Sequence, residues 1–218
     1  MDLPGRHGAD INEMLELIPL PNQQKWDGSI AYLDRDGVLN VGKSDYVNSV
    51  SELKVLAGVG NAVGSLRRAG FRVCVVTNQS PIGRGLWDDA RLAEIHSALQ
   101  ERLYVEDEDA HLDLILYSPY TPWSHSYIRK PRPGMLEVGR QIIDISSRGE
   151  PPLNIQLADG YDSNIFVEGK RSCMVGDRPA DIGAGLAHGV RMFHVDEKVG
   201  LSSVVDRIID IDDRGDSF

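Results

Sequence analysis

The chain alternates short, continuous apolar runs with longer stretches in which apolar residues recur every three or four positions. The continuous runs predict buried strands, which we expect at residues 30–33, 71–76, 112–117, 172–175 and 190–195. The second pattern predicts helices, which we expect at residues 59–69, 88–103, 135–145, 180–188 and 201–209. Because strands and helices alternate, the sequence predicts an α/β, three-layer Rossmann-like fold with a central parallel sheet between helices.

The domain organisation follows from the same pattern. Residues 29–218 form one predicted domain, because a chain of 218 residues with a 41% hydrophobic composition suffices for a single well-buried core. Residues 1–28 form a predicted N-terminal arm that lies on the domain or on a partner. Apolar residues between Ile11 and Ile18 are spaced for one short amphipathic turn, which Pro19 and Pro21 interrupt.

Polar side chains gather where the predicted strands end. Asp34 and Asp36 follow the first strand, Thr77 follows the second, Lys130 lies in the loop after the third, and Asp177 follows the fourth. Open α/β sheets bind ligands at the carboxyl ends of their strands, so we expect these residues to meet at one site. Each residue alone also fits a plain structural role, since D-x-D-G is an ordinary turn sequence and a lone lysine is usually a surface cation.

Four segments near these strand ends, D-R-D-G-V-L-N, V-V-T-N-Q-S, R-K-P and M-V-G-D-R-P-A-D, occur in the order of the four motifs of the haloacid dehalogenase-like (HAD) phosphotransferases, and the chain resembles that family. The resemblance implies that Asp34 is a nucleophile that attacks phosphorus and that Asp36 is a general acid and base. It also implies that Thr77 hydrogen-bonds the transferring oxygens and that Lys130 neutralises charge on Asp34 and the phosphoryl group.

The resemblance further implies a divalent cation, because an anionic nucleophile must approach an anionic substrate. Asp34, the main-chain carbonyl of Asp36, and Asp177 would supply the oxygen ligands that Mg²⁺ prefers. Asp181 lies one helical turn after Asp177, and we expect it to contact Lys130 or the metal-bound waters rather than the metal.

Within the HAD group, the segments D-Y-V, T-N-Q-S-P-I-G-R-G and R-K-P-R-P-G-M resemble the D,D-heptose 1,7-bisphosphate phosphatase and histidinol-phosphatase branch. That branch implies substrate contacts for Asn78, Gln79, Arg84, Arg129 and Arg178. We therefore expect Mg²⁺-dependent hydrolysis of a small phosphorylated metabolite, such as D-glycero-D-manno-heptose 1,7-bisphosphate, in a site with only a minimal loop cap. Histidinol-phosphate hydrolysis, and a HAD-fold binding or regulatory protein without turnover, stay open as alternatives.

The chain departs from that branch first in its zinc loop. The usual ligand positions hold residues that provide neither a thiolate nor an imidazole: Ser118, Tyr120, Ser126 and Ile128. We therefore expect no structural zinc. The loop is expected to be held by aromatic packing instead, from Tyr117, Tyr120, Trp123 and Tyr127.

Two further departures concern the surroundings of the site. Pro81 stands where the branch usually has glycine, and it stiffens the loop beside the expected phosphate position. An insertion at about residues 147–170 lengthens the connection into the fourth predicted strand, and its residues 164–167 favour an extra strand. We expect this insertion to form a rim over the site or an oligomer contact.

The charge and composition of the chain limit the classes of partner that it could bind. A formal net charge of -10 and a pI near 5.0 argue against a nucleic-acid or anionic-membrane surface, and so against a phosphatase acting on nucleic-acid ends. Cys74 and Cys173 lie in separate predicted strands, which favours reduced, buried thiols. We expect a cytoplasmic enzyme, and the sequence leaves open whether it is a monomer or a homo-oligomer.

Overall fold

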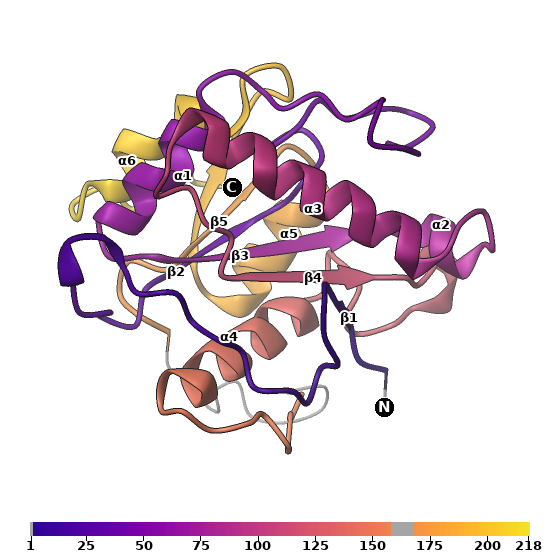
Figure 1. Ribbon diagram of the computed structural model, residues 1–218, viewed down its shortest axis with the longest axis horizontal. Helices are drawn as coiled ribbons and strands as arrows, with labels where there is room; N and C mark the ends of the chain where they lie inside the picture. Colours follow the sequence, from indigo (N-terminus) through magenta and orange to yellow (C-terminus); the bar gives the residue numbers. More distant parts are fainter. Residues whose placement is uncertain (1, 158–167) are drawn as a thin grey trace.

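The computed structural model describes residues 2–157 and 168–218. Its six-stranded sheet has the order β1-β4-β3-β2-β5-β6 (Figure 1). The strands are β1 (Gly5–Arg6), β2 (Ile30–Leu33), β3 (Arg72–Asn78), β4 (Leu114–Ser118), β5 (Cys173–Gly176) and β6 (Arg191–His194). Strands β2 to β6 are mutually parallel, and only β1 runs antiparallel to its neighbour β4.

Helices cover both faces of the sheet, which confirms the predicted three-layer α/β fold. One face packs against α1 (Val59–Arg68), α3 (Asp89–Glu106) and α6 (Val205–Ile209), and the other against α4 (Gly134–Ser147) and α5 (Pro179–His188) (Figure 1). Short helical turns complete the described chain: α2 (Ser80–Gly83), η1 (Pro21–Gln23), η2 (Pro122–Ser124) and η3 (Gly200–Ser203). Within the described residues, no helix is long and apolar enough to cross a membrane.

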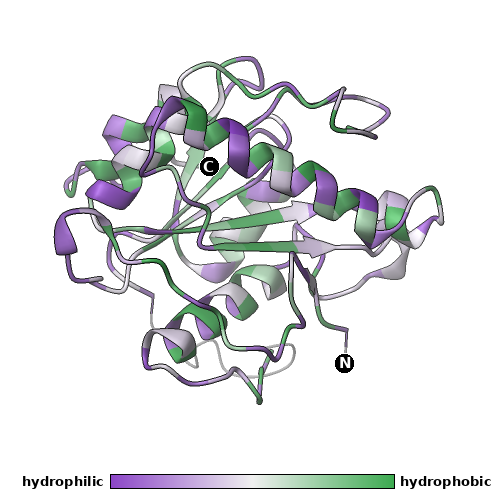
Figure 2. Cartoon of the chain, viewed as in Figure 1, coloured by the Kyte–Doolittle hydropathy of each residue, from purple (hydrophilic) through white to green (hydrophobic). Residues whose placement is uncertain are grey.

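The central strand β2 explains why the fold brings the polar strand ends together. Its four residues are fully buried, with Ala31 and Leu33 in one core layer and Ile30 and Tyr32 in the other. Figure 2 shows the hydrophobic colouring concentrated on the inner strands and the hydrophilic colouring on the outer faces of the helices. Because Leu33 is fully enclosed, its truncation to alanine would cost about 2–5 kcal/mol.

The two cysteines occupy the positions expected for packing residues. Cys74 lies on β3 in the core layer beneath α4, whereas Cys173 lies on β5 in the opposite layer. Both thiols are free and buried. Burial raises the pKa of each thiol, so both stay protonated at neutral pH.

The N-terminal arm lies on the domain, but the predicted amphipathic turn within it is wrong. Residues 14–20 are irregular, and the side chains of Arg67 and Arg72 bind the carbonyls of Ile18 and Pro19 at 2.6–3.4 Å. These guanidinium contacts satisfy backbone groups that a helical turn would have to bond internally. The arm also supplies β1, which pairs Gly5 with Tyr117 on β4 and was not predicted.

One other prediction needs correction. The predicted helix at 201–209 is divided into η3 and α6, because the backbone leaves helical geometry at Val204 (φ -126°, ψ -2°). The acidic residues after α3 are tied to α1, since Arg68 pairs with Asp107 at 2.7 Å and with Asp109 at 2.8 Å. The expected extra strand at 164–167 lies outside the described residues.

Candidate active site

Asp34 is the first residue after β2 and stands at the centre of the site. Its amide donates to the carbonyl of Val175 on β5 at 3.0 Å, so the sheet fixes its backbone. Its side chain is 9% exposed and accepts a hydrogen bond from the amide of Arg35 at 2.8 Å. Burial, reinforced by the charges of Asp181 and Asp36, raises the pKa of Asp34 to about 6 even though Lys130 opposes the shift.

Lys130 joins two of the carboxylates. Its Nζ lies 2.9 Å from Asp34 Oδ1 and 2.6 Å from Asp181 Oδ1, and all three side chains are almost fully buried. Burial alone would lower the pKa of Lys130, but the charges of Asp181 and Asp34 outweigh it and raise the pKa. The lysine therefore stays protonated and faces the oxygen that would attack phosphorus.

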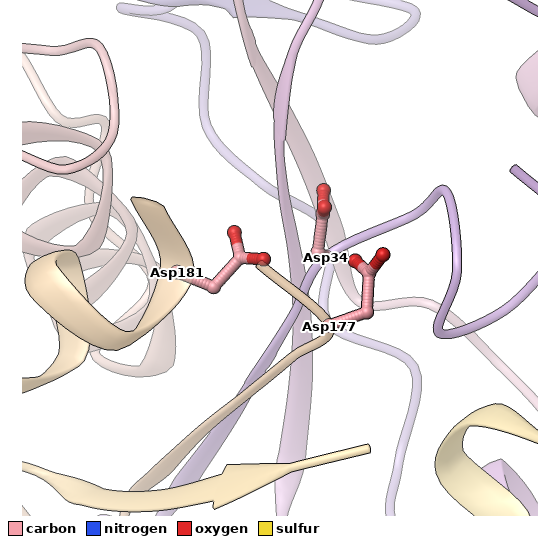
Figure 3. Close-up of side chains that lie close together, drawn as sticks. All are labelled: Asp34, Asp177 and Asp181. Atoms are coloured by element: carbon pink, nitrogen blue, oxygen red, sulfur yellow. The ribbon is translucent and has the colours of Figure 1, made fainter. Parts of the chain in front are cut away.

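The side chains of Asp34, Asp177 and Asp181 converge from β2, the loop after β5, and α5 (Figure 3). Each offers a carboxylate oxygen, and these oxygens lie within 4.8 Å of one another; in the described parts of the chain no other group of three or more His, Cys, Asp or Glu does so. Gly37, with a φ of 84°, makes room for this cluster, since a Cβ there would lie 2.5 Å from the carboxyl carbon of Asp177.

Asp177 and Asp181 differ in what their oxygens already bind. Asp181 Oδ1 pairs with Lys130, and Asp181 Oδ2 accepts from the amide of Arg178 at 3.0 Å. Asp177 Oδ1 is buried without a hydrogen-bond partner, and burial next to Asp34 raises the pKa of Asp177. An unpartnered carboxylate oxygen beside a second carboxylate is the donor set that a hard divalent cation fits. The geometry thus favours Asp34 and Asp177 as ligands, with Asp181 behind them.

Thr77 lies near the end of β3 with its side chain facing the same edge. Its Oγ1 accepts a hydrogen bond from Gln79 Nε2 at 2.9 Å, and Gln79 also donates to Asp36 Oδ2 at 3.2 Å. Because Gln79 is fully buried, the structure places it beneath Thr77 and Asp36. Its contacts fit a positioning role better than the substrate contact implied by the family resemblance.

Asp36 is held by three side chains. Arg35 Nη2 donates to its two oxygens at 2.8 and 3.0 Å, and Asn40 Nδ2 donates to Oδ1 at 2.8 Å. Burial raises the pKa of Asp36, but the charge of Arg35 and the hydrogen bonds from Asn40, Arg35 and Gln79 lower it more, so the net shift is downward. The carboxylate is therefore ionised in this structure.

The remaining predicted substrate residues differ in exposure and in their contacts. Asn78 exchanges hydrogen bonds with the main chain of Lys130 at 3.1 and 3.2 Å, which ties β3 to the lysine loop. Arg178 is exposed, and its Nε lies 3.5 Å from Asp177 Oδ2. Arg84 is exposed as well, whereas Arg129 is half-buried and donates from Nη1 to the carbonyl of Tyr120 at 2.8 Å.

Beside these groups lies a cavity of about 300 Å³, lined by Asn78, Arg129 and Lys130 together with residues of the loop after β4. The predicted aromatic packing of that loop is partly wrong, because Trp123 is 67% exposed and lies beneath the guanidinium of Arg84, 5.1 Å from its ring centroid. Polar contacts hold the loop as well, among them the hydrogen bond from Tyr127 Oη to Glu137 at 2.6 Å.

Between β2 and α1 the described chain forms loops rather than a cap domain. Residues 41–58, all described, contain neither a helix nor a strand, and one helix separates β2 from β3 as expected. Tyr46, whose φ is 68°, places its hydroxyl 3.1 Å from Ser80 Oγ at the start of α2. Pro81 occupies the first turn of α2, where its fixed φ and missing N–H are compatible with a helix start.

Comparisons with known proteins agree with this geometry. A family model described as HAD-hydrolase-like matches residues 127–206. The D-glycero-beta-D-manno-heptose-1,7-bisphosphate 7-phosphatase of Pseudomonas putida is 33% identical over 159 residues, which cover 73% of this chain and 77% of that enzyme. This chain belongs to the HAD-like phosphatases. The same-named enzyme of Escherichia coli is 32% identical over 166 residues, which cover 73% of this phosphatase and 74% of the relative.

A shorter match is more similar in sequence. The enzyme of that name from Pseudomonas aeruginosa is 38% identical over 120 residues, covering 54% of this phosphatase and 66% of the relative. Among solved structures, a D,D-heptose 1,7-bisphosphate phosphatase from B. bronchiseptica, complexed with magnesium and phosphate, superposes with a TM-score of 0.60 at 26% identity, covering 82% of this phosphatase and 98% of that chain. A HAD-like phosphatase from Mesorhizobium loti gives a TM-score of 0.63 at 26% identity, covering 94% of both chains.

Some residues of the site were not predicted. These are Arg35 and Asn40, which hydrogen-bond Asp36, and Tyr46, which contacts Ser80. All three lie in sequence segments that resemble the HAD motifs. Their positions in these segments could have marked them as candidate site residues, but nothing in the sequence indicated which way their side chains point.

Proposed function

We propose that this phosphatase hydrolyses a phosphomonoester of a small sugar, with D-glycero-D-manno-heptose 1,7-bisphosphate as the leading candidate, through an aspartyl-phosphate on Asp34. The observation that carries the proposal is the meeting of Asp34, Lys130 and Asp177 at the carboxyl edge of the sheet. The name shared by the P. putida, E. coli and P. aeruginosa relatives supports the choice of substrate over histidinol phosphate.

In this proposal Asp34 attacks phosphorus and the bond to the leaving oxygen breaks. Lys130, 2.9 Å from Asp34 Oδ1, balances charge on the nucleophile and on the phosphoryl group. Thr77 supplies a hydroxyl at the same edge to bind a phosphoryl oxygen. In the second half-reaction Asp36 takes a proton from the water that hydrolyses the aspartyl-phosphate.

Asp36 must also be protonated when the first bond breaks, because it donates its proton to the leaving oxygen. In the free enzyme, burial raises the pKa of Asp36, but the charge of Arg35 and the hydrogen bonds from Asn40, Arg35 and Gln79 together lower it more. A bound phosphate dianion acts in the opposite direction, because a nearby like charge favours the neutral carboxylic acid. We therefore propose that binding of the substrate phosphate raises the pKa of Asp36, so that Asp36 becomes protonated.

The residues present fit a divalent cation, which we propose to be Mg²⁺. Asp34, Asp177 and the main-chain carbonyl of Asp36 would hold it, with Asp181 and Lys130 behind. When bound, it would neutralise charge shared by the nucleophile and the phosphate. The buried, unpartnered Oδ1 of Asp177 supports this assignment.

Arg84 and Arg129 form a cationic rim that fits a second anionic group on the substrate. Arg84 is close enough to Arg129 for its charge to lower the pKa of that residue, although burial is the larger cause. Two neighbouring guanidinium groups repel one another unless an anion lies between them. Arg129 also lines the cavity beside Lys130, so a bisphosphate could reach both the nucleophile and this rim.

The decisive experiment is turnover of p-nitrophenyl phosphate with Mg²⁺, followed by a panel of heptose bisphosphates, histidinol phosphate and common sugar phosphates. We expect activity that Asp34→Asn abolishes, and a kcat/KM that is highest for a heptose bisphosphate. Failure of the wild-type protein to turn over any phosphate, despite normal Mg²⁺ binding, would instead favour a binding protein without catalysis. A higher kcat/KM for histidinol phosphate would overturn the substrate assignment alone.

A further inference from the structure

Behind the carboxylates lies a second layer of buried side chains, Arg35 and His96. Arg35 is fully buried between Asp36 and helix α3. Its Nε and Nη2 face Asp36, at 3.3 Å from Nε to Oδ1 and 2.8 Å from Nη2 to Oδ2. Its Nη1 lies 3.4 Å from Nε2 of His96, which is also fully buried.

The direction of the contact between Arg35 and His96 is fixed by chemistry. A guanidinium has donors and no acceptor, so Nε2 of His96 must accept and the ring must be neutral with its proton on Nδ1. Burial, then the charge of Arg35, then that of His7 hold the pKa of His96 well below its usual value, which favours the neutral ring. In this tautomer the proton on Nδ1 is buried without a hydrogen-bond partner.

His96 is itself enclosed from the side of the N-terminal arm. The ring of His7 meets it edge-on with centroids 5.4 Å apart, and Tyr117 on β4 lies at 6.2 Å. The ring therefore has little freedom to turn away from Arg35. Without it, Nη1 of a fully buried guanidinium would lose this acceptor.

We propose that His96 is a positioning residue for the acid and base work of Asp36. By accepting from Nη1 it sets the plane of the Arg35 guanidinium, and that plane sets the orientation of the Asp36 carboxylate. The inference rests on the proposed function, since it assigns His96 to the same reaction.

The positioning role has a chemical signature. As Asp34 forms its bond to phosphorus and the P–O bond breaks, the bond electrons pass to the leaving oxygen, which takes the proton of Asp36. A sugar alkoxide needs that proton because it is a strong base. A p-nitrophenolate leaves as a stable anion and does not. Misorienting Asp36 should therefore slow alkyl phosphates more than p-nitrophenyl phosphate.

The test compares His96→Phe and His96→Gln with the wild-type enzyme, on p-nitrophenyl phosphate and on the best sugar phosphate of the panel. We expect His96→Phe to lower kcat/KM, which reports the steps up to departure of the leaving group, by about tenfold or more for the sugar phosphate. Its kcat/KM for p-nitrophenyl phosphate should fall less than about threefold. His96→Gln, whose amide oxygen can accept from Arg35, should recover most of the loss.

Leu103→Ala is the matched control, because Leu103 is fully buried on the same helix and packs in the hydrophobic core. It should lower the melting temperature without changing the ratio of the two kcat/KM values. If His96→Phe does not fold, His96→Asn takes its place, since its shorter side chain draws the acceptor away from Nη1.

The outcomes separate the two proposals. Equal loss on both substrates, the same ratio change in Leu103→Ala, or no recovery in His96→Gln would overturn the positioning role. A wild-type protein that hydrolyses neither substrate would overturn the proposed function instead.

Discussion

Replacing Asp34 by asparagine should stabilise the metal-free protein while removing its turnover. The carboxylate is buried beside two other acidic residues, Asp181 and Asp36, which together with burial outweigh the benefit of Lys130. Asparagine has nearly the same shape without the charge. The substitution therefore removes an electrostatic cost of the folded state, at the same position where it removes the proposed nucleophile.

The magnitude follows from the pKa of Asp34, which rises from 3.8 to about 6 on folding. A difference of about two pKa units corresponds to about 3 kcal/mol between the two protonation states. This is the upper limit for the gain in free energy of unfolding at pH 7.5. In a chain of this length it would raise the melting temperature by about 6–12 °C.

The pH dependence has a definite sign. Since the folded pKa of Asp34 is raised, the folded state holds its proton more tightly than the unfolded state between about pH 4 and pH 6. The contribution of Asp34 to the stability of the wild-type protein therefore falls as pH rises through this window. The difference between Asp34→Asn and the wild type should be small at pH 4 and complete above pH 7.

The assay is urea denaturation in EDTA at pH 4.5 and pH 7.5. Asp45→Asn serves as control, because its carboxylate is 72% exposed and its removal should change the free energy of unfolding by less than about 0.5 kcal/mol. If Asp34→Asn is no more stable than the wild type at pH 7.5, the electrostatic description of the site is wrong.

Three further changes probe the same site. Lys130→Met leaves Asp34 and Asp181 without their shared cation, so it should lower the free energy of unfolding by about 3 kcal/mol in urea denaturation. Unchanged stability would contradict the buried ion pairs. Mg²⁺ should raise the melting temperature of the wild type but not of Asp177→Asn; an equal rise in both would place the cation elsewhere. Arg129→Lys should raise KM for a sugar bisphosphate about tenfold with little change in kcat, because lysine cannot grip a phosphate bidentately; unaltered steady-state kinetics would remove Arg129 from the substrate site.

The sequence was most informative where hydrophobic periodicity and parallel topology act together. Strand β2 was predicted with its observed bounds, since four uncharged residues stand directly before Asp34. Parallel strands bring their carboxyl ends to one edge, so Asp34, Lys130 and Asp177 could be grouped although long stretches of chain separate them. Membership of the HAD-like phosphatases was confirmed by the relatives.

The orientation of individual polar side chains was beyond the sequence. Arg35 looks like a surface cation between two aspartates, yet it is fully buried, because His96 arrives from a helix some 60 residues later at 3.4 Å. Gln79 stands in a loop-like motif but turns inward to Thr77. Such choices depend on which partners tertiary packing supplies, and periodicity carries no information about them.

Strand β1 has a practical consequence for shortened forms of the protein. Its two residues pair with Leu116 and Tyr117, and so protect the outer edge of β4. A fragment that starts at residue 29 would present β4 as a bare edge, which is a template for pairing with another chain. Dimers or aggregates of such a fragment would then report the loss of its edge protection, and its oligomeric state would be a poor guide to that of the full chain.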